Sequence, residues 1–267
     1  KKFSEIKDRV CSANVYIDSF SIAEALELGA DIVLCGRVSD PGLVVGPCIY
    51  EFGWGRNEFD KLASATVAGH IIECGAQCTG GNFSRWKDIK NLENIGFPIA
   101  SIYHSGMFEI SKPKGSGGLI NKYTISEQIL YELGNPQKYI SPDVCVDFTS
   151  FKLKENSNNT VSIHNVKGFE PTDTYKVSIS YFNGYKASGQ LTIAGPNAYE
   201  KANKTAEIIW GRLKKQGYAF DETNTELLGY NSCQKSMNLK YNGSNEVVLR
   251  LAVKDSDKDK IYSFVLW

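Results

Sequence analysis

The stretch that decides the predicted fold is Ala30-Asp31-Ile32-Val33-Leu34-Cys35-Gly36-Arg37-Val38-Ser39-Asp40. Its segment Asp31–Cys35 is an almost continuous apolar run, which is typical of a strand buried on both faces of a sheet. A β-prone segment, Asn14–Ile17, and a helix that begins at Ser19 or Ser21 and ends near Leu28 precede it. This order of strand, helix and strand predicts a βαβ unit, and with it a parallel sheet.

The residues that follow the predicted strand are candidates for a ligand site. A helix is expected from Pro41 toward Phe52, because proline favours the first helical position. Ligands of open α/β sheets bind at the carboxyl ends of the strands, so Arg37 and Ser39 are predicted to bind ligand and Asp40 to take part in catalysis. The alternative is that Asp40 only caps the helix and Arg37 is a solvated loop residue.

The next predicted helix carries polar side chains on its apolar face. At helical spacing the apolar arc contains Phe59, Leu62, Ala63, Thr66 and Val67, and His70, Glu73, Cys74 and Gln77 fall within the same arc. Buried polar groups are paired or line a cavity. We therefore predict that His70 and Glu73 form a catalytic acid–base pair and that Gln77 binds ligand. A structural pair is the alternative. A metal site at His70 and Cys74 lacks a specific signature, so no metal is predicted.

Two glycine-rich loops are predicted to hold an anionic ligand through free backbone N–H groups. Their candidate residues are Thr79, Gly80 and Gly81 in the first loop and Lys112, Lys114, Gly115, Ser116, Gly117 and Gly118 in the second. Neither loop matches the phosphate-binding patterns of nucleotide or dinucleotide sites, so neither ATP nor NAD is predicted. Plain flexible turns are the alternative.

The second half of the chain is predicted to consist mostly of antiparallel strands. Alternating segments occur at Val144–Leu153, Thr160–Val166, Tyr175–Phe182, Tyr185–Ile193 and Glu246–Val253. Asn183-Gly184 predicts a hairpin between the third and the fourth of them. A helix is expected from Gly195-Pro196-Asn197 to about Lys215. The predicted fold is α/β, with a parallel-sheet part at residues 1–140 that holds the candidate site and an antiparallel α+β part at residues 141–267; the two parts can also form one compact unit.

Composition limits the partners and the compartment. The 267 residues contain 30 Lys and Arg against 30 Asp and Glu, so the net charge is zero and neither nucleic acid nor an anionic membrane is expected as a partner. No membrane-spanning or secretory segment is predicted. Seven dispersed cysteines indicate free thiols in a reducing compartment, such as the cytoplasm or the mitochondrial matrix. Both ends read as interrupted helices, so we expect the chain to be a piece of a longer protein.

Several of these motifs resemble, in sequence and in order, the acyclic terpene utilisation (AtuA-like) family. They are Ala30–Asp40, Thr66–Gly81, Gly96–Ala100, Lys112–Gly118, Ser141–Val144 and Gly195–Asn197, and they extend over nearly the whole chain. The resemblance implies a longer polypeptide and a role in the breakdown of branched acyclic terpenoids and related acids. It also implies a place beside enzymes that act on acyl-CoA. Asn197 is carried over as a ligand-binding candidate.

Two functions are compatible with these observations. The first is an enzyme of branched acyl-CoA catabolism with lyase- or hydratase-type acid–base chemistry, in which coenzyme A enters as part of a thioester substrate and no other cofactor is implied. Its partner is then an acyl-CoA or a branched acid. The second is a non-catalytic subunit of an acyl-CoA carboxylase-type complex. We expect a homo-oligomer or a member of a complex in either case.

Overall fold

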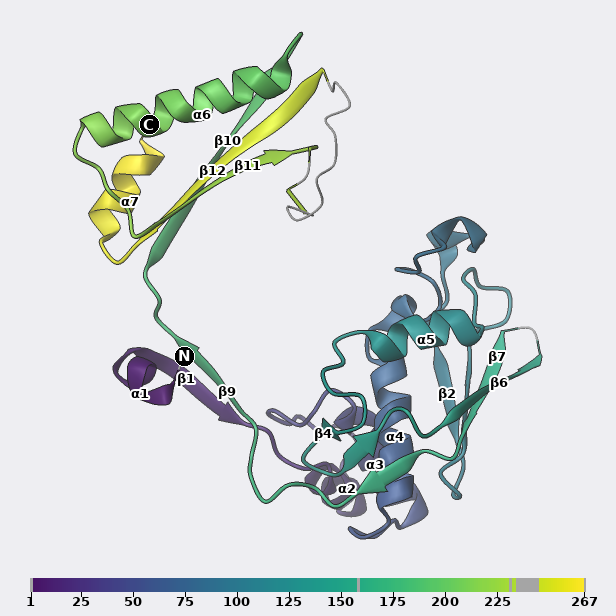
Figure 1. Ribbon diagram of the computed structural model, residues 1–267. Coiled ribbons are helices and arrows are strands. Elements are labelled where there is room, and N and C mark those ends of the chain that lie inside the picture. Colours follow the sequence, from purple (N-terminus) through teal and green to yellow (C-terminus); the bar gives the residue numbers. More distant parts are fainter. Residues whose placement is uncertain (1, 158, 231, 234–244, 267) are drawn as a thin grey trace. The chain divides into compact units, whose positions relative to one another are not determined.

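The computed structural model describes residues 2–157, 159–230, 232–233 and 245–266 (Figure 1). The chain forms two compact units. The larger one is Ser12–Ile179, and the smaller one combines Lys1–Cys11 with Ser180–Trp267. The contacts therefore divide the chain at residues 11–12 and 179–180 rather than near residue 140. Both positions fall within the two-stranded sheet of β1 (Val10–Val15) and β9 (Val177–Tyr181).

The larger unit mixes helices with two antiparallel sheets. Its helices are α2 (Phe20–Glu27), α3 (Gly42–Phe52), α4 (Phe59–Ile72) and α5 (Lys122–Leu130), with 3-10 turns η2 (Gly75–Gln77), η3 (Trp86–Asp88) and η4 (Leu92–Asn94). The first sheet has the order β2-β3-β7-β6, with β2 (Ile99–Ile102), β3 (Phe108–Ser111), β7 (Thr160–His164) and β6 (Lys152–Ser157). The second has the order β4-β5-β8, with β4 (Tyr139–Ile140), β5 (Cys145–Asp147) and β8 (Lys167–Phe169). Every pairing in these two sheets is antiparallel.

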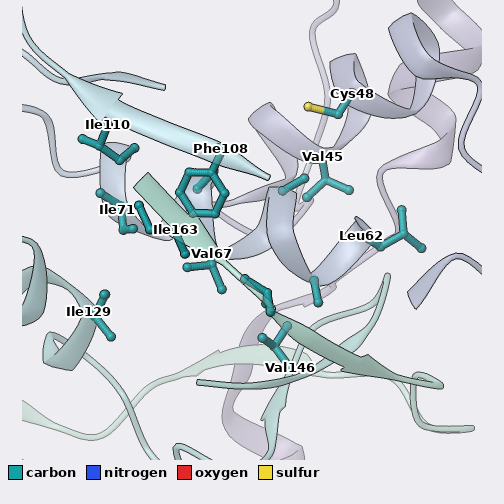
Figure 2. Packing of buried hydrophobic residues seen from close by; sticks show 14 of the residues in the cluster. Val45, Cys48, Leu62, Val67, Ile71, Phe108, Ile110, Ile129, Val146 and Ile163 are labelled. Atoms are coloured by element: carbon teal, nitrogen blue, oxygen red, sulfur yellow. The ribbon is translucent and has the colours of Figure 1, made fainter. Parts of the chain in front are cut away.

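Helix α4 is the centre of the larger unit. Its residues Leu62–Ile71 are all buried, which is expected of a helix that is covered on every side. Figure 2 shows Val67 and Ile71 of this helix among side chains of the neighbouring strands, including Phe108 of β3 and Ile163 of β7. The core of the larger unit therefore forms around α4.

A glycine brings α3 against the end of α4. A Cβ atom at Gly69 would lie 2.6 Å from Cα of Pro41, the residue at the start of α3. Only glycine permits this approach without a shift of the backbone. The close contact places Ser39 and Asp40, which precede α3, beside the last turn of α4.

The predicted parallel sheet is wrong, although the predicted helix between its two strands is present as α2. Residues 31–35 form no strand, and the side chains of Ile32 and Leu34 lie at the surface, with 88% and 98% of each residue exposed. Parallel pairing at this place is a single bridge between Ile17 and Val38. A parallel strand needs a hydrogen-bonded neighbour, and no described residue pairs with 31–35. The expected mixture of helices and strands is confirmed, but its sheets are antiparallel.

The smaller unit contains an antiparallel sheet covered on one face by helices. Its elements are α1 (Phe3–Ile6), η1 (Lys7–Arg9), β10 (Tyr185–Ala194), α6 (Ala198–Lys215), β11 (Glu222–Leu228), β12 (Glu246–Asp255) and α7 (Lys258–Val265). The strand order β10-β12-β11 and the sequence β-α-β-β-α are those of the first five elements of a split βαβ motif. Leu249 and Leu251 of β12 pack with Ala202 and Ala206 of α6 in a core of their own.

The predicted hairpin at Asn183-Gly184 is wrong. Gly184 does adopt a positive φ of 89°, so the chain turns where the sequence predicted a turn. The strand that follows, β10, pairs with β12 over its whole length, from Tyr185 opposite Asp255 to Ala194 opposite Glu246, whereas β9 pairs with β1. The turn residues thus determine a local change of direction and not the partner of the strand.

Among the described residues, no helix has both the length and the apolar character that crossing a membrane requires.

Candidate functional site

His70 and Glu73 form the predicted pair in the last turn of α4. Nε2 of His70 lies 3.3 Å from the carbonyl oxygen of Ile129 and, because a carbonyl only accepts, Nε2 donates. Nδ1 then faces Oε1 of Glu73 at 3.5 Å. This second contact is attractive only when a proton lies on one of the two groups, either as imidazolium and carboxylate or as imidazole and carboxylic acid. The two side chains are therefore neighbours whose mutual attraction depends on protonation.

The two members of the pair differ in access to solvent. The His70 side chain is 3% exposed and that of Glu73 is 18% exposed. Aromatic rings hold the imidazole, with Phe148 edge-on at 5.4 Å and Tyr139 at 6.0 Å between ring centroids. Nε2 of Gln128 donates to the His70 carbonyl oxygen at 3.0 Å. His70 is thus fixed from several sides, and Glu73 is the member that can reach a ligand.

Three carboxylates, Asp40, Glu73 and Glu132, act together on Cys74 and Tyr139; we call them the carboxylate cluster. Burial raises the pKa of Cys74, and the charges of all three carboxylates raise it further. Burial, followed by the same three charges, raises the pKa of Tyr139 to about 12. Both groups are therefore neutral near pH 7, and Tyr139 keeps its O–H as a hydrogen-bond donor.

The members of the cluster come from separate elements. The contact between Gly69 and Pro41 brings Asp40 to the end of α4. Glu132 follows α5 with a φ of 54°, a conformation that costs free energy for a residue other than glycine and that is frequent at functional sites. The N-cap of α3 is Pro41 and has no side-chain cap bond, so the Asp40 carboxylate is not used for capping.

The predicted residues Arg37 and Ser39 lie at the border of this site. Nη1 of Arg37 donates to the hydroxyl of Tyr16 at 3.0 Å, and Tyr16 contributes to raising the pKa of Tyr139. Ser39 is buried, and its Oγ has no hydrogen-bond partner among the described residues. The structure therefore brings Arg37, Ser39, Asp40, His70 and Glu73 into one region.

The two glycine-rich loops pack against each other. Thr79 accepts a hydrogen bond from the N–H of Leu119 at 2.8 Å, and a Cβ at Gly117 would lie 1.9 Å from the carbonyl oxygen of Asn91. The N–H groups of Gly80, Gly81, Gly117 and Gly118 all donate to backbone carbonyls within the protein. These donors are not free, so they do not form the anion cradle that the sequence suggested.

Some side chains of the second loop also donate hydrogen bonds within the protein. Nζ of Lys112 donates to the carbonyl oxygen of Ser116 at 2.7 Å, and Oγ of Ser116 donates to Pro113. Lys114 and Gly115 are exposed and face solvent. Asn197 belongs to the smaller unit, where it precedes α6 with a φ of 61°.

Gln77 lines a pocket of about 290 Å³ together with Gln128 and Tyr131. The charge of Glu132 raises the pKa of Tyr131, and Oε1 of the buried Gln128 has no partner among the described residues. This pocket therefore adjoins the carboxylate cluster. Within the part of the chain that the structure describes, no three His, Cys, Asp or Glu side chains are arranged to hold a metal ion.

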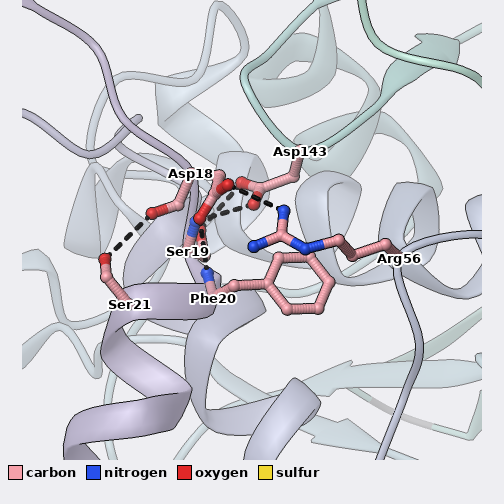
Figure 3. Close-up of polar contacts among 6 residues, drawn as sticks. All are labelled: Asp18, Ser19, Phe20, Ser21, Arg56 and Asp143. Carbon is pink, nitrogen blue, oxygen red and sulfur yellow. Dashed lines mark hydrogen bonds and ion pairs between the residues drawn. The ribbon is translucent and has the colours of Figure 1, made fainter.

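A second polar group anchors the start of α2 (Figure 3). The buried carboxylate of Asp143 accepts from the backbone N–H of Ser19 at 2.7 Å and from its hydroxyl at 2.8 Å. Burial raises the pKa of Asp143. Arg56 pairs with Asp18 at 2.8 Å and lies over the Phe20 ring. These groups satisfy one another, which indicates a structural role.

Sequence reasoning missed Tyr16, Glu132 and Tyr139. Tyr139 lies in a short strand and Glu132 just beyond α5, and neither position follows a pattern that marks a site. Both reach the carboxylate cluster only through the packing of α5 and β4 near the end of α4. A weak signal exists for Glu132, which stands two residues before the Gly134-Asn135-Pro136 turn.

Fold and site together define a mixed α/β protein of two units, whose larger unit carries a histidine–glutamate pair among further carboxylates. The chain belongs to the acyclic terpene utilisation family AtuA, because the model of that family, described as "Acyclic terpene utilisation family protein AtuA", matches residues 1–266. The membership predicted from the motifs is confirmed, and it indicates a role in acyclic terpene utilisation. Comparison with curated proteins and with solved structures finds no match.

Proposed function

We propose that this protein is an enzyme of branched acyclic terpenoid catabolism that moves a proton at the carbon next to an acyl thioester. The observation that carries the proposal is the 3.5 Å contact between Nδ1 of His70 and Oε1 of Glu73, with Glu73 as the more exposed member. In the imidazolium form of the pair, Glu73 is a carboxylate and can act as a base. In the other form it is a carboxylic acid and can return the proton.

The carboxylate cluster favours a neutral reacting group. A free acid would bring a further negative charge toward Asp40, Glu73 and Glu132, and like charges repel each other. A thioester carries no charge at its reacting end. This argument favours a coenzyme A thioester over the free branched acid as the substrate.

The step can be written with the groups that surround Glu73. The carboxylate removes a proton from the carbon next to the thioester carbonyl, and the electron pair moves onto the carbonyl oxygen. Tyr139, which is neutral because its pKa is raised to about 12, donates a hydrogen bond to that oxygen. The electron pair then returns to take a proton, or expels a group from the next carbon, as hydratases in the dehydration direction and lyases require.

The remaining ligand contacts belong to the same proposal. Arg37 and Ser39 border the reacting groups, and Gln77 lines the adjoining pocket. Lys114 and Gly115 are the exposed part of the second loop. The backbone N–H groups of Gly80, Gly81, Gly117 and Gly118 already donate within the protein, so no ligand contact is assigned to them.

The test is deuterium exchange into a branched acyl-CoA in D₂O, followed by NMR. The wild-type protein is expected to exchange the protons next to the thioester and to leave the corresponding free acid unchanged. Thioester binding without exchange would contradict the proposed chemistry.

A second candidate is a non-catalytic subunit of a carboxylase-type complex. The apolar side chains of Leu28, Ile32 and Leu34 favour it, because they are close in sequence and highly exposed, and exposed apolar surface is typical of contacts with other proteins. This function predicts co-purification with an acyl-CoA carboxylase and no deuterium exchange in isolation. Exchange by the isolated protein would argue against it.

A further inference from the structure

Tyr16 is held between two cationic residues by its backbone. The N–H of Tyr16 donates to the carbonyl oxygen of Lys176 at 2.9 Å, and the N–H of Ile17 donates to that of Arg37 at 2.9 Å. Adjacent residues of an extended chain direct their N–H groups to opposite sides. Lys176 and Arg37 therefore flank Tyr16, one on each side, although they are distant in the sequence.

The two side chains converge on the Tyr16 ring. Nζ of Lys176 lies 4.6 Å from the ring centroid and the guanidinium carbon of Arg37 lies 5.5 Å from it. Both distances are within the range of cation–π contacts. The hydroxyl of Tyr16 also accepts from Nη1 of Arg37 at 3.0 Å. The ring thus positions two positive charges around one phenol.

Neither cation forms an ion pair with any residue that the structure describes, whereas Arg56, Lys61 and Lys167 do. Tyr16 and Lys176 line a pocket of about 220 Å³ with Ser141, Thr172 and Thr174, whose hydroxyls donate within the protein, so that Lys176 is the cation of the lining. Asp18 also lines it, but its charge is paired with Arg56 at 2.8 Å. Asp173 is the remaining carboxylate of the pocket.

We infer that Arg37, Tyr16 and Lys176 form a subsite for an anionic group of the ligand, which we call the tyrosine clamp. The inference rests on the proposed function in one respect, namely that the ligand carrying this anionic group is an acyl thioester. Two cations on one tyrosine ring fit an oxyanion with several acceptor oxygens. Such a group is supplied either by a phosphate of the thiol carrier or by a second carboxylate on the acyl chain.

The experiment is a calorimetric titration of the protein with two simple anions, inorganic pyrophosphate and glutarate, at constant ionic strength. At least one is expected to bind saturably with one site. Lys176→Ala and Arg37→Ala should each weaken that binding about tenfold, the effect of losing one charge-assisted contact. Lys176→Arg should retain it within about threefold, because the charge is kept.

Lys122→Ala is the matched control, because Lys122 also lies over a tyrosine ring, with Nζ 5.1 Å from the centroid of Tyr123. It should bind the anion as the wild type does. Saturable binding of pyrophosphate alone assigns the clamp to a phosphate, and binding of glutarate alone assigns it to a carboxylate.

The inference is overturned if neither anion binds saturably, or if Lys122→Ala weakens binding as much as Lys176→Ala does. Because no turnover is measured, this outcome is separate from that of the proposed function. Anion binding without deuterium exchange would support the tyrosine clamp and contradict the proposed proton transfer. Exchange without anion binding would support the proton transfer and contradict the clamp.

Discussion

At the scale of single residues, the role of Tyr139 depends on its remaining protonated. Burial and the carboxylate cluster raise its pKa to about 12, so its hydroxyl is a donor throughout the physiological range. Tyr139→Phe removes that donor and keeps the ring that contacts His70. We expect the deuterium exchange rate to fall about 10²-fold, which is typical of losing one donor to a developing oxyanion, with little change in substrate binding. An unchanged rate would exclude this role.

Asp143 gives a prediction about pH. Because burial raises its pKa, the folded protein holds this proton to higher pH than the unfolded chain does. The stabilisation is complete below about pH 4 and is lost as the pH rises through the raised pKa. Urea unfolding of the larger unit should show that the stability of the wild type, relative to Asp143→Asn, falls over this range and is constant above it. A difference that increases with pH would contradict the assignment.

His70 and Glu73 could be predicted from the sequence because both lie on one helix, where a spacing of three residues places side chains together. Their placement inside the apolar arc also indicated burial. Lys176 and Tyr16 could not be predicted to meet, since a backbone hydrogen bond between remote segments joins them. Local periodicity contains no information about such pairs.

At the scale of elements, the position of α3 depends on Gly69. An alanine Cβ there would lie 2.6 Å from Cα and 2.7 Å from the carbonyl oxygen of Pro41. The resulting overpacking should cost about 1–3 kcal/mol, against a gain of about 1 kcal/mol in helix propensity. We expect Gly69→Ala to destabilise the larger unit in urea unfolding and to slow deuterium exchange into the substrate, because Asp40 moves with α3.

Gly211→Ala is the control for this prediction, since Gly211 lies inside α6 and an added Cβ would meet no atom within 4 Å. It should stabilise the smaller unit by about 0.5–1 kcal/mol. If Gly69→Ala were stabilising as well, the close approach of α3 and α4 would be wrong.

The helices were easier to predict than the strands. Periodicity and end signals indicated α3 and α6 nearly at their observed bounds, because these signals are local, whereas α4 ends at Ile72, before Cys74 and Gln77, which the predicted helical arc included. The apolar run at residues 31–35 has the pattern of a buried strand, but burial of a strand depends on neighbours that the run itself does not specify. Strand pairing of β10 with β12 was missed for the same reason.

At the scale of the whole molecule, the two units have separate hydrophobic cores that share no residue. Leu249→Ala, at a fully buried position of β12, should cost about 2–5 kcal/mol in the smaller unit. Hydrogen exchange measured by mass spectrometry should become faster in β10, β12 and α6 and stay unchanged in α4. Equal acceleration in α4 would show that the two units unfold as one.

The central claim is that Glu73 moves a proton of the substrate, and the most direct test compares Glu73→Gln with the wild type in D₂O. Glutamine keeps the size of the side chain and cannot take up the proton. The claim predicts that the variant binds a branched acyl-CoA with unchanged affinity and exchanges deuterium at least about 10²-fold more slowly. Exchange at the wild-type rate by a folded Glu73→Gln protein would contradict it.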